Sequence, residues 1–367
     1  MKDKMGIPGF NKFIKSKVPE IYQTRYSSSF RGKRLGIDAS NILFRFKSTA
    51  NKQVLQVTNV ASEETDEGEV QNKFKERLCE FVLGLLRVGI SPVFVFDEKA
   101  PVSKLNVQKE RQEKKLVLLE AIEKLKQDLK EETNAGKISD LRKKMCQVNY
   151  LTSSDIQIAT ELLSAMGIPC LKAKEEADKL LAMMCREGKV EAVYSTDTDL
   201  LAMGTPIVVT DMGHREWNPE LRKREDTFKV TIFEGLLKGL GMSYATFLDL
   251  CIMAGCDYNE NIKGIAFAKA FKLLIKSKSI EAINLPNKEC LNTAICRKNF
   301  GYEKSSVLCE TELILDIDKT LTNSRDILEM HGCSYVMEIL VTIYKNFGPI
   351  EPSKFRPPQQ IKLKLIN

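Results

Sequence analysis

Three short apolar runs, each ending in an acidic residue, constrain the fold of this chain most strongly. They are Arg34–Asp38, Pro92–Asp97 and Val190–Asp199, and the last ends in two carboxylates, Asp197 and Asp199. Each run is typical of a buried strand, and a carboxylate at the end of such a strand is costly unless a partner offsets its charge. In an open parallel sheet the carboxyl ends of the strands line one edge, where ligands bind. We therefore expect these acids to converge at one edge.

Between these runs, the hydrophobic spacing predicts alternating helices and strands. Such alternation indicates an α/β protein with a mixed, mainly parallel central sheet flanked by helices. The polar stretch 48–72 is typical of a loop. The helix dipole favours acids in a first helical turn, so Glu176 and Asp178 have a structural interpretation beside a functional one. The expected helices include Val70–Val88, Glu175–Gly188 and Tyr244–Ala254, and the further strands are Ile168–Leu171 and Pro206–Thr210.

Charge and cysteine content narrow the class of protein. The 367 residues carry a formal net charge of +7, which suits either a solvated basic surface or a polyanionic substrate held beside an acidic pocket. The ten cysteines show no zinc-ligand spacing and there are only two histidines, so a zinc site is not expected. Cysteines in apolar contexts predict reduced core thiols and an intracellular setting, with no signal peptide or membrane span. They are Cys79, Cys170, Cys185, Cys251 and Cys256.

The segment 102–150 differs in composition from its surroundings. It is dense in Lys, Glu, Gln and Leu, and it carries twelve Lys or Arg residues against eight Asp or Glu residues. The pattern predicts exposed helices inserted between two elements of the sheet. A solvated helical hairpin and a basic device that grips a single nucleic-acid strand both fit this composition.

Seven carboxylates are expected at one site. Like charges this close raise one another's pKa, and hard divalent cations with oxygen ligands relieve the repulsion. Two ions about 3.5–4 Å apart would clamp the attacking water and the leaving oxygen of a phosphodiester displacement. Neither His214 nor His331 lies in a triad-like context. The seven are Asp38, Asp97, Glu176, Asp178, Asp197, Asp199 and Asp257.

Six segments resemble, in order, the motifs of the flap endonuclease/XPG family of structure-specific 5′ nucleases. They are Met5-Gly-Ile-Pro-Gly-Phe, Gly36-Ile-Asp-Ala-Ser, Val95-Phe-Asp, Glu176-Ala-Asp, Ser195-Thr-Asp-Thr-Asp-Leu-Leu and Gly255-Cys-Asp-Tyr. Each is weak alone, but the ordered set is highly specific. The resemblance implies a PIN-like 5′ nuclease fold and Mg²⁺-dependent hydrolysis at 5′ flaps or single-strand–duplex junctions of DNA, in replication, repair or recombination.

The same resemblance implies roles for single residues. Asp38, Asp97 and Glu176 would face one Mg²⁺, for which Mn²⁺ can substitute. Asp197, Asp199 and Asp257 would face a second ion, and Asp178 would bridge the two. The 102–150 insertion resembles the family's helical arch, with Lys104 and Arg111 at the scissile phosphate. Phe44 lies where an aromatic ring can stack on a terminal base, although core packing is the alternative.

A helix–two-turn–helix element that grips the duplex backbone is implied for the region after Asp257. Three lysines spaced along one helix face suit contacts with phosphates, which carry no base-sequence information. The family's second turn glycine is replaced by Ala266, so a bound K⁺ is left open. The duplex-binding residues are expected to be Lys263, Gly264, Ile265, Lys269, Lys272 and Lys276.

Other departures from the family pattern keep alternatives open. Flap endonucleases usually have Glu where Asp178 stands, and Gly255-Cys-Asp-Tyr leans toward the exonuclease-like branch. A processive 5′→3′ double-strand exonuclease is therefore the second hypothesis, and a non-catalytic DNA-junction binder is the third. Four residues precede the Met5-Gly motif, so Met1 and Met5 are both candidate starts.

The resemblance also implies a binding partner and a location for the protein. We expect the protein to be a monomer that binds DNA. Association with a membrane is not expected, and we find no sliding-clamp motif in the basic tail 349–367. The location is expected to be the nucleus or a viral or cytoplasmic site of DNA replication, and a compact viral family member fits the length.

The chain is expected to have five parts. They are a nuclease region 5–101, the arch 102–150, a second nuclease region 151–256, the helix–two-turn–helix element 257–285 and a C-terminal helical region with its tail 286–367.

Overall fold

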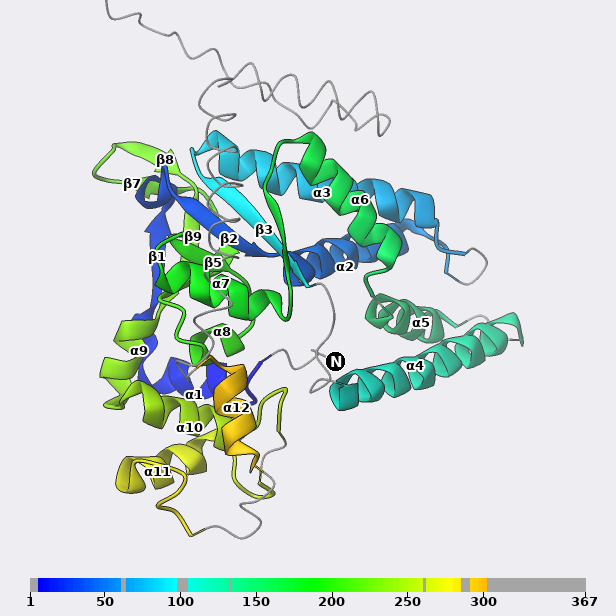
Figure 1. The fold of residues 1–367 in the computed structure, drawn as a ribbon. Helices are drawn as coiled ribbons and strands as arrows, with labels where there is room; N and C mark the ends of the chain where they lie inside the picture. The colour runs from blue at the N-terminus through cyan, green and yellow to red at the C-terminus, as the bar shows by residue number, and fades with distance from the viewer. Residues whose placement is uncertain are drawn as a thin grey trace, which may run out of the picture.

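A seven-stranded mixed sheet forms the centre of the molecule in the computed structural model (Figure 1). The strand order is β1-β9-β6-β5-β2-β3-β4, and all pairs from β6 to β4 are parallel, whereas β9 pairs antiparallel with both β6 and β1. The mixed, mainly parallel sheet predicted from the sequence is confirmed. The structure describes residues 6–60, 64–97, 105–131, 134–148, 150–259, 262–284 and 291–301, with the backbone alone at 105–111 and 131.

The strands place the acid-ended runs side by side. Strand β2 lies between β3 and β5, so the three predicted runs are neighbours in the sheet. The strands of the sheet are β1 (Tyr22–Tyr26), β2 (Arg34–Asp38), β3 (Ser91–Asp97), β4 (Cys170–Ala173), β5 (Ala192–Tyr194), β6 (Ile207–Met212) and β9 (Thr227–Ile232). A separate hairpin consists of β7 (Glu216–Asn218) and β8 (Lys223–Glu225).

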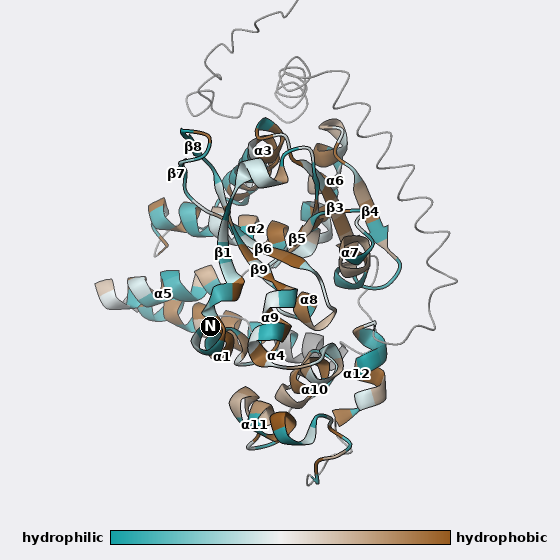
Figure 2. Ribbon diagram, turned by 90° about the vertical axis from the view of Figure 1, so that its left-hand side faces the viewer, coloured by the Kyte–Doolittle hydropathy of each residue, from teal (hydrophilic) through white to brown (hydrophobic). Residues whose placement is uncertain are grey.

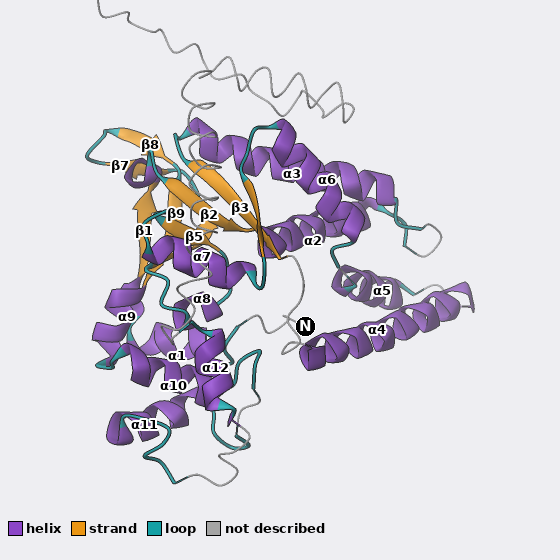
Figure 3. Cartoon of the chain, viewed as in Figure 1, coloured by secondary structure: helices purple, strands orange, loops and turns teal. Residues whose placement is uncertain are grey.

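Helices cover both faces of the sheet (Figure 3). Two short 3₁₀ turns, η1 (Pro19–Ile21) and η2 (Ser27–Phe30), flank β1. The helices are α1 (Phe10–Lys17), α2 (Ala39–Val57), α3 (Glu67–Arg87), α4 (Leu105–Glu131), α5 (Ala135–Gln147), α6 (Ser153–Ala165), α7 (Ala177–Arg186), α8 (Asp199–Ala202), α9 (Phe233–Leu240), α10 (Tyr244–Ala254), α11 (Phe267–Ser277) and α12 (Thr293–Asn299).

The largest differences from the predicted element limits are in α2 and β5, and β4 also lies two residues later than the strand expected over Ile168–Leu171. The loop expected over 48–72 is wrong in its first part, because α2 continues to Val57 and buries Ala50, Val54 and Leu55 on one face. The strand expected over 190–199 is shorter, since β5 ends at Tyr194 and the acidic segment forms a turn that leads into α8. The second half of α2 was not predicted, because polar residues lie between its buried residues and obscure the helical spacing of the apolar positions.

Alternate side chains of the strands enter two separate core layers. In β3, Val93 and Val95 join the layer with α1, α7 and α10, whereas Phe94 and Phe96 join the layer with α2, α3 and α6. Hydrophobic colour is strong along β3 and β6 (Figure 2). Gly36 allows α7 to approach β2 closely, because a Cβ at this position would lie 2.7 Å from Leu181 Cδ2. Every described strand end near the site is thus held from both faces.

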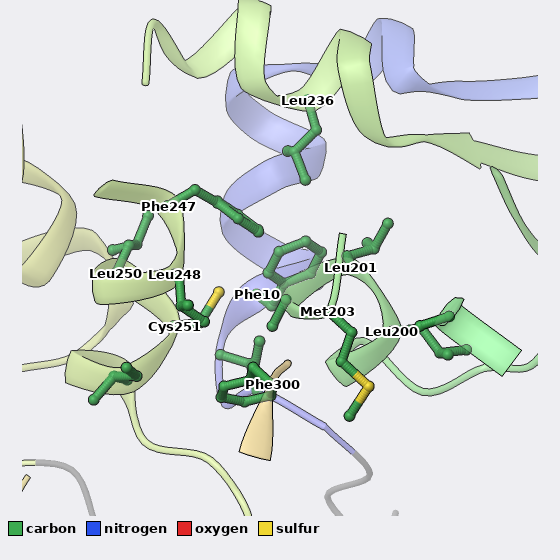
Figure 4. Packing of buried hydrophobic residues seen from close by; sticks show 14 of the residues in the cluster. Phe10, Leu200, Leu201, Met203, Leu236, Phe247, Leu248, Leu250, Cys251 and Phe300 are labelled. Carbon is green, nitrogen blue, oxygen red and sulfur yellow. The ribbon is translucent and has the colours of Figure 1, made fainter. Parts of the chain in front are cut away.

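The first helix completes one core layer close to the acidic edge. Phe10 of α1 packs edge-on against Phe247 of α10, with ring centroids 6.3 Å apart. Figure 4 shows Phe10 among side chains from α8 and α10, including Leu201, and beside Phe300, which directly follows α12. Segments from the beginning and the end of the described chain therefore share one cluster.

Helices α4 and α5 form a hairpin that stands away from the sheet (Figure 1). The hairpin has a small core of its own, which includes Leu141 and Ile122 and packs against Leu55 of α2. Arg142 ties the hairpin to the end of α2 by donating to the Leu55 carbonyl oxygen at 2.8 Å. Val117 on α4 is 65% exposed, so the outer face is solvated. The predicted helical insertion is confirmed as a structure, while its division as a domain stays a prediction.

The described cysteines are free thiols, as expected from the sequence. In the described ranges, no single helix has both the length and the apolar composition to cross a membrane. The bent pair α9–α10 meets that criterion only jointly, and α10 is buried along most of its length.

Replacing Leu141 by Ala should loosen the hairpin. Leu141 is fully buried, and large-to-small substitutions at such sites cost about 2–5 kcal/mol of unfolding free energy. Val117→Ala on the exposed face is the matched control and should change stability by less than about 0.5 kcal/mol. Denaturant unfolding with hydrogen exchange over α4 and α5 measures both effects. Equal stability of the two variants would contradict the packing described here.

Candidate functional site

Asp38 occupies the end of β2 and caps α2. Its Oδ1 accepts the backbone N–H of Asn41 at 3.0 Å, and its Oδ2 accepts the Ser195 hydroxyl at 2.8 Å. Burial raises the pKa of Asp38 to about 7, with further increases from the charges of Asp97 and Asp197, although the hydrogen bonds from Asn41 and Ser195 act against this rise. Asp38 is therefore an acid held beside other acids in a buried position.

Asp97 ties the end of β3 to the beginning of α7. Its Oδ2 accepts the Ser40 hydroxyl at 2.7 Å, and its Oδ1 accepts the Ala177 backbone N–H at 2.8 Å. Ala177 lies directly between Glu176 and Asp178 in the chain. The carboxylate of Asp97 is thus fixed against the helix turn that carries the next two acids.

Glu176 and Asp178 both interact with Tyr258, Glu176 through a hydrogen bond and Asp178 through its charge. Glu176 is 4% exposed, and its Oε2 accepts the Tyr258 hydroxyl at 2.6 Å. Burial raises the pKa of Tyr258, and so do the nearby charges of Glu176, Asp199 and Asp178. These shared electrostatic effects place three of the acids around one phenol.

Asp197 lies in the turn between β5 and α8, and Asp199 is the first residue of α8. The Asp197 N–H donates to Ser195 Oγ at 3.1 Å, and the Asp199 N–H donates to Asp197 Oδ1 at 3.0 Å. Gly6 packs against this turn with a φ of +75°, and a Cβ there would lie 2.6 Å from Asp197 Oδ1. The N-terminal segment therefore lies directly against the acidic turn, where only glycine fits.

Six of the seven predicted acids belong to one connected group of contacts and charges. The seventh, Asp257, is adjacent in the chain to Tyr258, whose hydroxyl reaches Glu176. Within the described ranges, no three His, Cys, Asp or Glu side chains are arranged closely enough to hold a metal ion. The group is thus a set of carboxylates gathered around shared donors, rather than a closed coordination shell.

Other predicted residues are placed only in part. Lys104 lies outside the described residues, as do Met1, Met5 and the tail 349–367. Arg111 lies in α4, where only the backbone is described. Phe44 is half-buried on α2, and its predicted stacking role stays a prediction.

The lysine-bearing helix forms a separate surface. Lys269, Lys272 and Lys276 are exposed on α11 and line a surface pocket together with Ile275. Lys269 Nζ donates to the Gly264 carbonyl oxygen at 3.2 Å. Lys263 and Gly264 are exposed in the preceding turn, as expected for backbone contacts. Ile265 is 5% exposed and belongs to the core, so its expected contact with the duplex stays a prediction.

The donors that orient the acids were missed by sequence reasoning. Ser195, Ser40 and Tyr258 each donate a hydroxyl to a predicted site carboxylate. Asn41 adds a link across the site by donating from Nδ2 to Thr196 Oγ1 at 3.0 Å. The available signal was the position of these side chains within one to three residues of an acid in each motif.

Two family models and several known proteins match this chain. The family model for the XPG N-terminal domain matches residues 5–117, and the model for the XPG I-region matches residues 167–257. Flap endonuclease 1 of Glossina morsitans morsitans is 32% identical over 279 residues, covering 76% of this chain and 68% of that relative. The chain belongs to the flap endonuclease/XPG family. The predicted resemblance is confirmed.

Further members of the family give the extent of the match. Flap endonuclease 1 of Glycine max is 31% identical over 320 residues, covering 86% of this chain and 78% of the relative. The chain covers only 57% and 61% of the length of the flap endonuclease 1 proteins of Cryptosporidium muris and Cryptosporidium parvum. The catalytic core of Rad2 in complex with DNA substrate has a TM-score of 0.53 at 20% identity, over 90% of this chain and 85% of that one. This likeness supports the family's PIN-like fold.

Asp38→Asn should make the free protein more stable at neutral pH. The folded pKa of about 7 exceeds the ordinary value of 3.8, so between these values the folded state holds a proton that the unfolded state has lost. The unfolding free energy should therefore fall as pH rises from about 4 to about 7 in buffer without divalent ions.

The Asn variant lacks this contribution and should be more stable at pH 7.5 by on the order of 1–3 kcal/mol. Urea unfolding at pH 5 and pH 7.5 measures the difference. Asp140→Asn, which changes an exposed carboxylate on α5, is the matched control. A parallel pH dependence of the Asp38 variant and the parent would contradict the buried, repelled state of Asp38.

Proposed function

We propose that this chain is a divalent-metal-dependent nuclease that hydrolyses DNA at 5′ flaps and single-strand–duplex junctions. The observation that carries the proposal is the connected group of acids at the ends of adjacent parallel strands. Family membership supports the same activity. Because the chain covers less than two thirds of its Cryptosporidium relatives, the activity is proposed for this chain from its own residues.

The donor chemistry fits hard divalent cations. Nucleases of this family depend on divalent metal ions, and all seven acids offer carboxylate oxygens, which Mg²⁺ prefers. We assign Asp38, Asp97 and Glu176 to one Mg²⁺, whose binding would draw these side chains closer together than they lie in this structure, and Mn²⁺ would substitute. Bound ions would lower the pKa of an attacking water and stabilise charge on the phosphate. The second ion is assigned to Asp197, Asp199 and Asp257, with Asp178 between the two.

The chain's own residues would prepare the site for this chemistry. Ser195 holds Asp38 and Asp197 in one orientation, because its hydroxyl donates to the first and accepts from the backbone of the second. Tyr258 restrains Glu176 in the same way. The cations Lys104 and Arg111 are proposed to bind the scissile phosphate, since Lys and Arg are the side chains that pair with phosphate oxygens.

The α11 surface is proposed to hold the duplex part of the substrate. Lys269, Lys272 and Lys276 would contact phosphates, together with the backbone of the turn at Lys263, Gly264 and Ile265. Such contacts position DNA without reading its sequence, and the binding they provide weakens as salt rises. Phe44 is proposed to stack on a base at the junction. The protein would act as an intracellular monomer, and the relatives named above come from cellular organisms.

A processive 5′→3′ exonuclease is the second candidate. The observation that favours it is Asp178, where flap endonucleases usually carry Glu, together with the segment Gly255-Cys-Asp-Tyr. A double-flap substrate labelled at its 5′ end separates the two activities. One oligonucleotide as long as the flap supports flap cleavage, whereas mononucleotides support the exonuclease.

Asp197→Ala should abolish cleavage while leaving DNA binding intact. Loss of groups that merely orient metal ligands costs about 10- to 100-fold, so loss of a ligand should cost at least about 100-fold. Cleavage is measured with Mg²⁺, and binding of the junction is measured with Ca²⁺. Asp140→Ala, an exposed acid outside the site, is the control and should cleave at the parental rate. Cleavage by the Asp197 variant at the parental rate would sink the assignment.

Ser195→Ala should weaken metal-dependent activity without removing a carboxylate. The hydroxyl is buried and links two acids, so its loss should raise the Mg²⁺ concentration needed for half-maximal cleavage by about 10- to 100-fold. Ser195→Thr keeps the hydroxyl and should recover most of the activity. If the Thr variant responds to Mg²⁺ no better than the Ala variant, the hydroxyl has no orienting role.

A further inference from the structure

Two thiols meet beside the acidic site, and neither belongs to the proposed machinery. Cys256 is half-buried in the turn after α10, whereas Cys296 is fully buried on α12. Both thiols donate to Asn259 Oδ1, at 2.7 Å from Cys256 Sγ and 3.5 Å from Cys296 Sγ. Residues 40 positions apart in the sequence therefore bring their sulfur atoms together.

Hydrogen bonds hold both Cys256 and its acceptor Asn259 in place. The turn is closed by reciprocal backbone hydrogen bonds of 3.2 Å between Cys256 and Asn259. Asn259 Nδ2 also donates to the Ile252 carbonyl oxygen at 2.9 Å. Because this amide is anchored, its oxygen presents a fixed acceptor to both thiols.

Helix α12 and the residue after it are fixed by contacts with α10, with α7 and with Tyr258 of this turn. Arg297 Nε donates to Asp249 of α10 at 3.2 Å, and Asn299 accepts Lys179 Nζ of α7 at 3.3 Å. One turn after Cys296, the ring of Phe300 packs edge-on against Tyr258 with centroids 5.3 Å apart. Figure 4 shows Phe300, the residue directly after α12, among the buried side chains of the core. The thiol contact is thus built into a packed interface.

We propose that Cys256 and Cys296 form an oxidisable dithiol that a peroxide converts into a disulfide. Cys256, the more accessible thiol, would attack the peroxide, giving Cys256 sulfenic acid and releasing water or an alcohol. Cys296 would then attack that sulfur, so the S–S bond forms as the S–OH bond breaks and a second water leaves. The two thiols lose two electrons and two protons, and the peroxide is reduced. A transient disulfide of this kind is the form that redox sensing takes in reducing compartments.

The disulfide would act on the site through the turn. Cys256 is followed directly by Asp257 and Tyr258, and Tyr258 donates to Glu176. Drawing the sulfur atoms to the roughly 2.05 Å of an S–S bond would break the thiol hydrogen bonds to Asn259 and shift the turn. Oxidation should therefore lower metal-dependent cleavage, and this consequence rests on the proposed function.

Peptide mapping of the full chain tests the proposal. The reduced protein is treated with hydrogen peroxide under native conditions, the remaining thiols are alkylated, and the peptides are analysed by mass spectrometry. We expect a linked pair of peptides containing Cys256 and Cys296 that dithiothreitol separates. Cys296→Ser should abolish the link. Cys256→Ser should abolish it as well, and it replaces the first variant as the test if that variant folds poorly. Cys170→Ser, which changes a half-buried thiol on β4, is the control and should leave the link unchanged.

Cleavage assays then test the consequence separately. Peroxide should lower Mg²⁺-dependent cleavage by the parent about 10- to 100-fold, the range for disturbing groups that orient ligands, and dithiothreitol should restore it. The Cys296→Ser variant should keep its activity in peroxide. Absence of the Cys256–Cys296 link would overturn the inference, and a link without loss of cleavage would overturn its regulatory consequence. A chain that forms the link but never cleaves DNA would instead contradict the proposed function.

Discussion

The crowding of carboxylates at one sheet edge, where Asp38 and Asp199 are buried and Asp97 is exposed, is the constraint on which the rest of this structure depends. Parallel strands deliver Asp38 and Asp97 to one edge, and the turn after β5 delivers Asp197 to the same place. Hydroxyl and backbone N–H donors hold these acids, yet the pKa of Asp38 still rises to about 7, with burial as the main cause. The donors therefore orient the charges more than they neutralise them. A folded protein keeps such a cluster only when its stability elsewhere exceeds this cost.

That stability comes from packing on both faces of the sheet. Alternate residues of β3 supply both core layers, and the close approach of α7 to β2 requires Gly36. The two layers fix the directions of the strand ends, and the N-terminal segment at Gly6 closes the site from a third side. Distant parts of the chain are therefore all needed to position one acidic edge. Family membership is consistent with this division of labour between scaffold and site.

Much of this arrangement could be predicted from the sequence, because strand and cap signals are local. The limits of β2 and of α10 match the predictions. The later half of α2 was missed, since its buried residues are diluted by polar ones that face solvent. The contacts of Ser195 with Asp38 and of Cys296 with Asn259 could not be predicted, because each joins residues from distant segments whose distance only the fold determines. Acids are recognisable by type, whereas the hydroxyls and thiols around them are common residues with no distinctive pattern.

The local and functional interpretations of the acids are compatible. Asp38 is a helix cap, which explains its bond from the Asn41 N–H, but capping does not explain the buried hydroxyl of Ser195 that reaches it across 157 positions. Helix-dipole stabilisation likewise explains an acid at the beginning of α7, but not the phenol of Tyr258 on Glu176. An ionised carboxylate offers about four acceptor sites, so two hydrogen bonds to the protein leave capacity for a cation. A residue that caps a helix can therefore also bind an ion, and the long-range donors distinguish this site from ordinary helix ends.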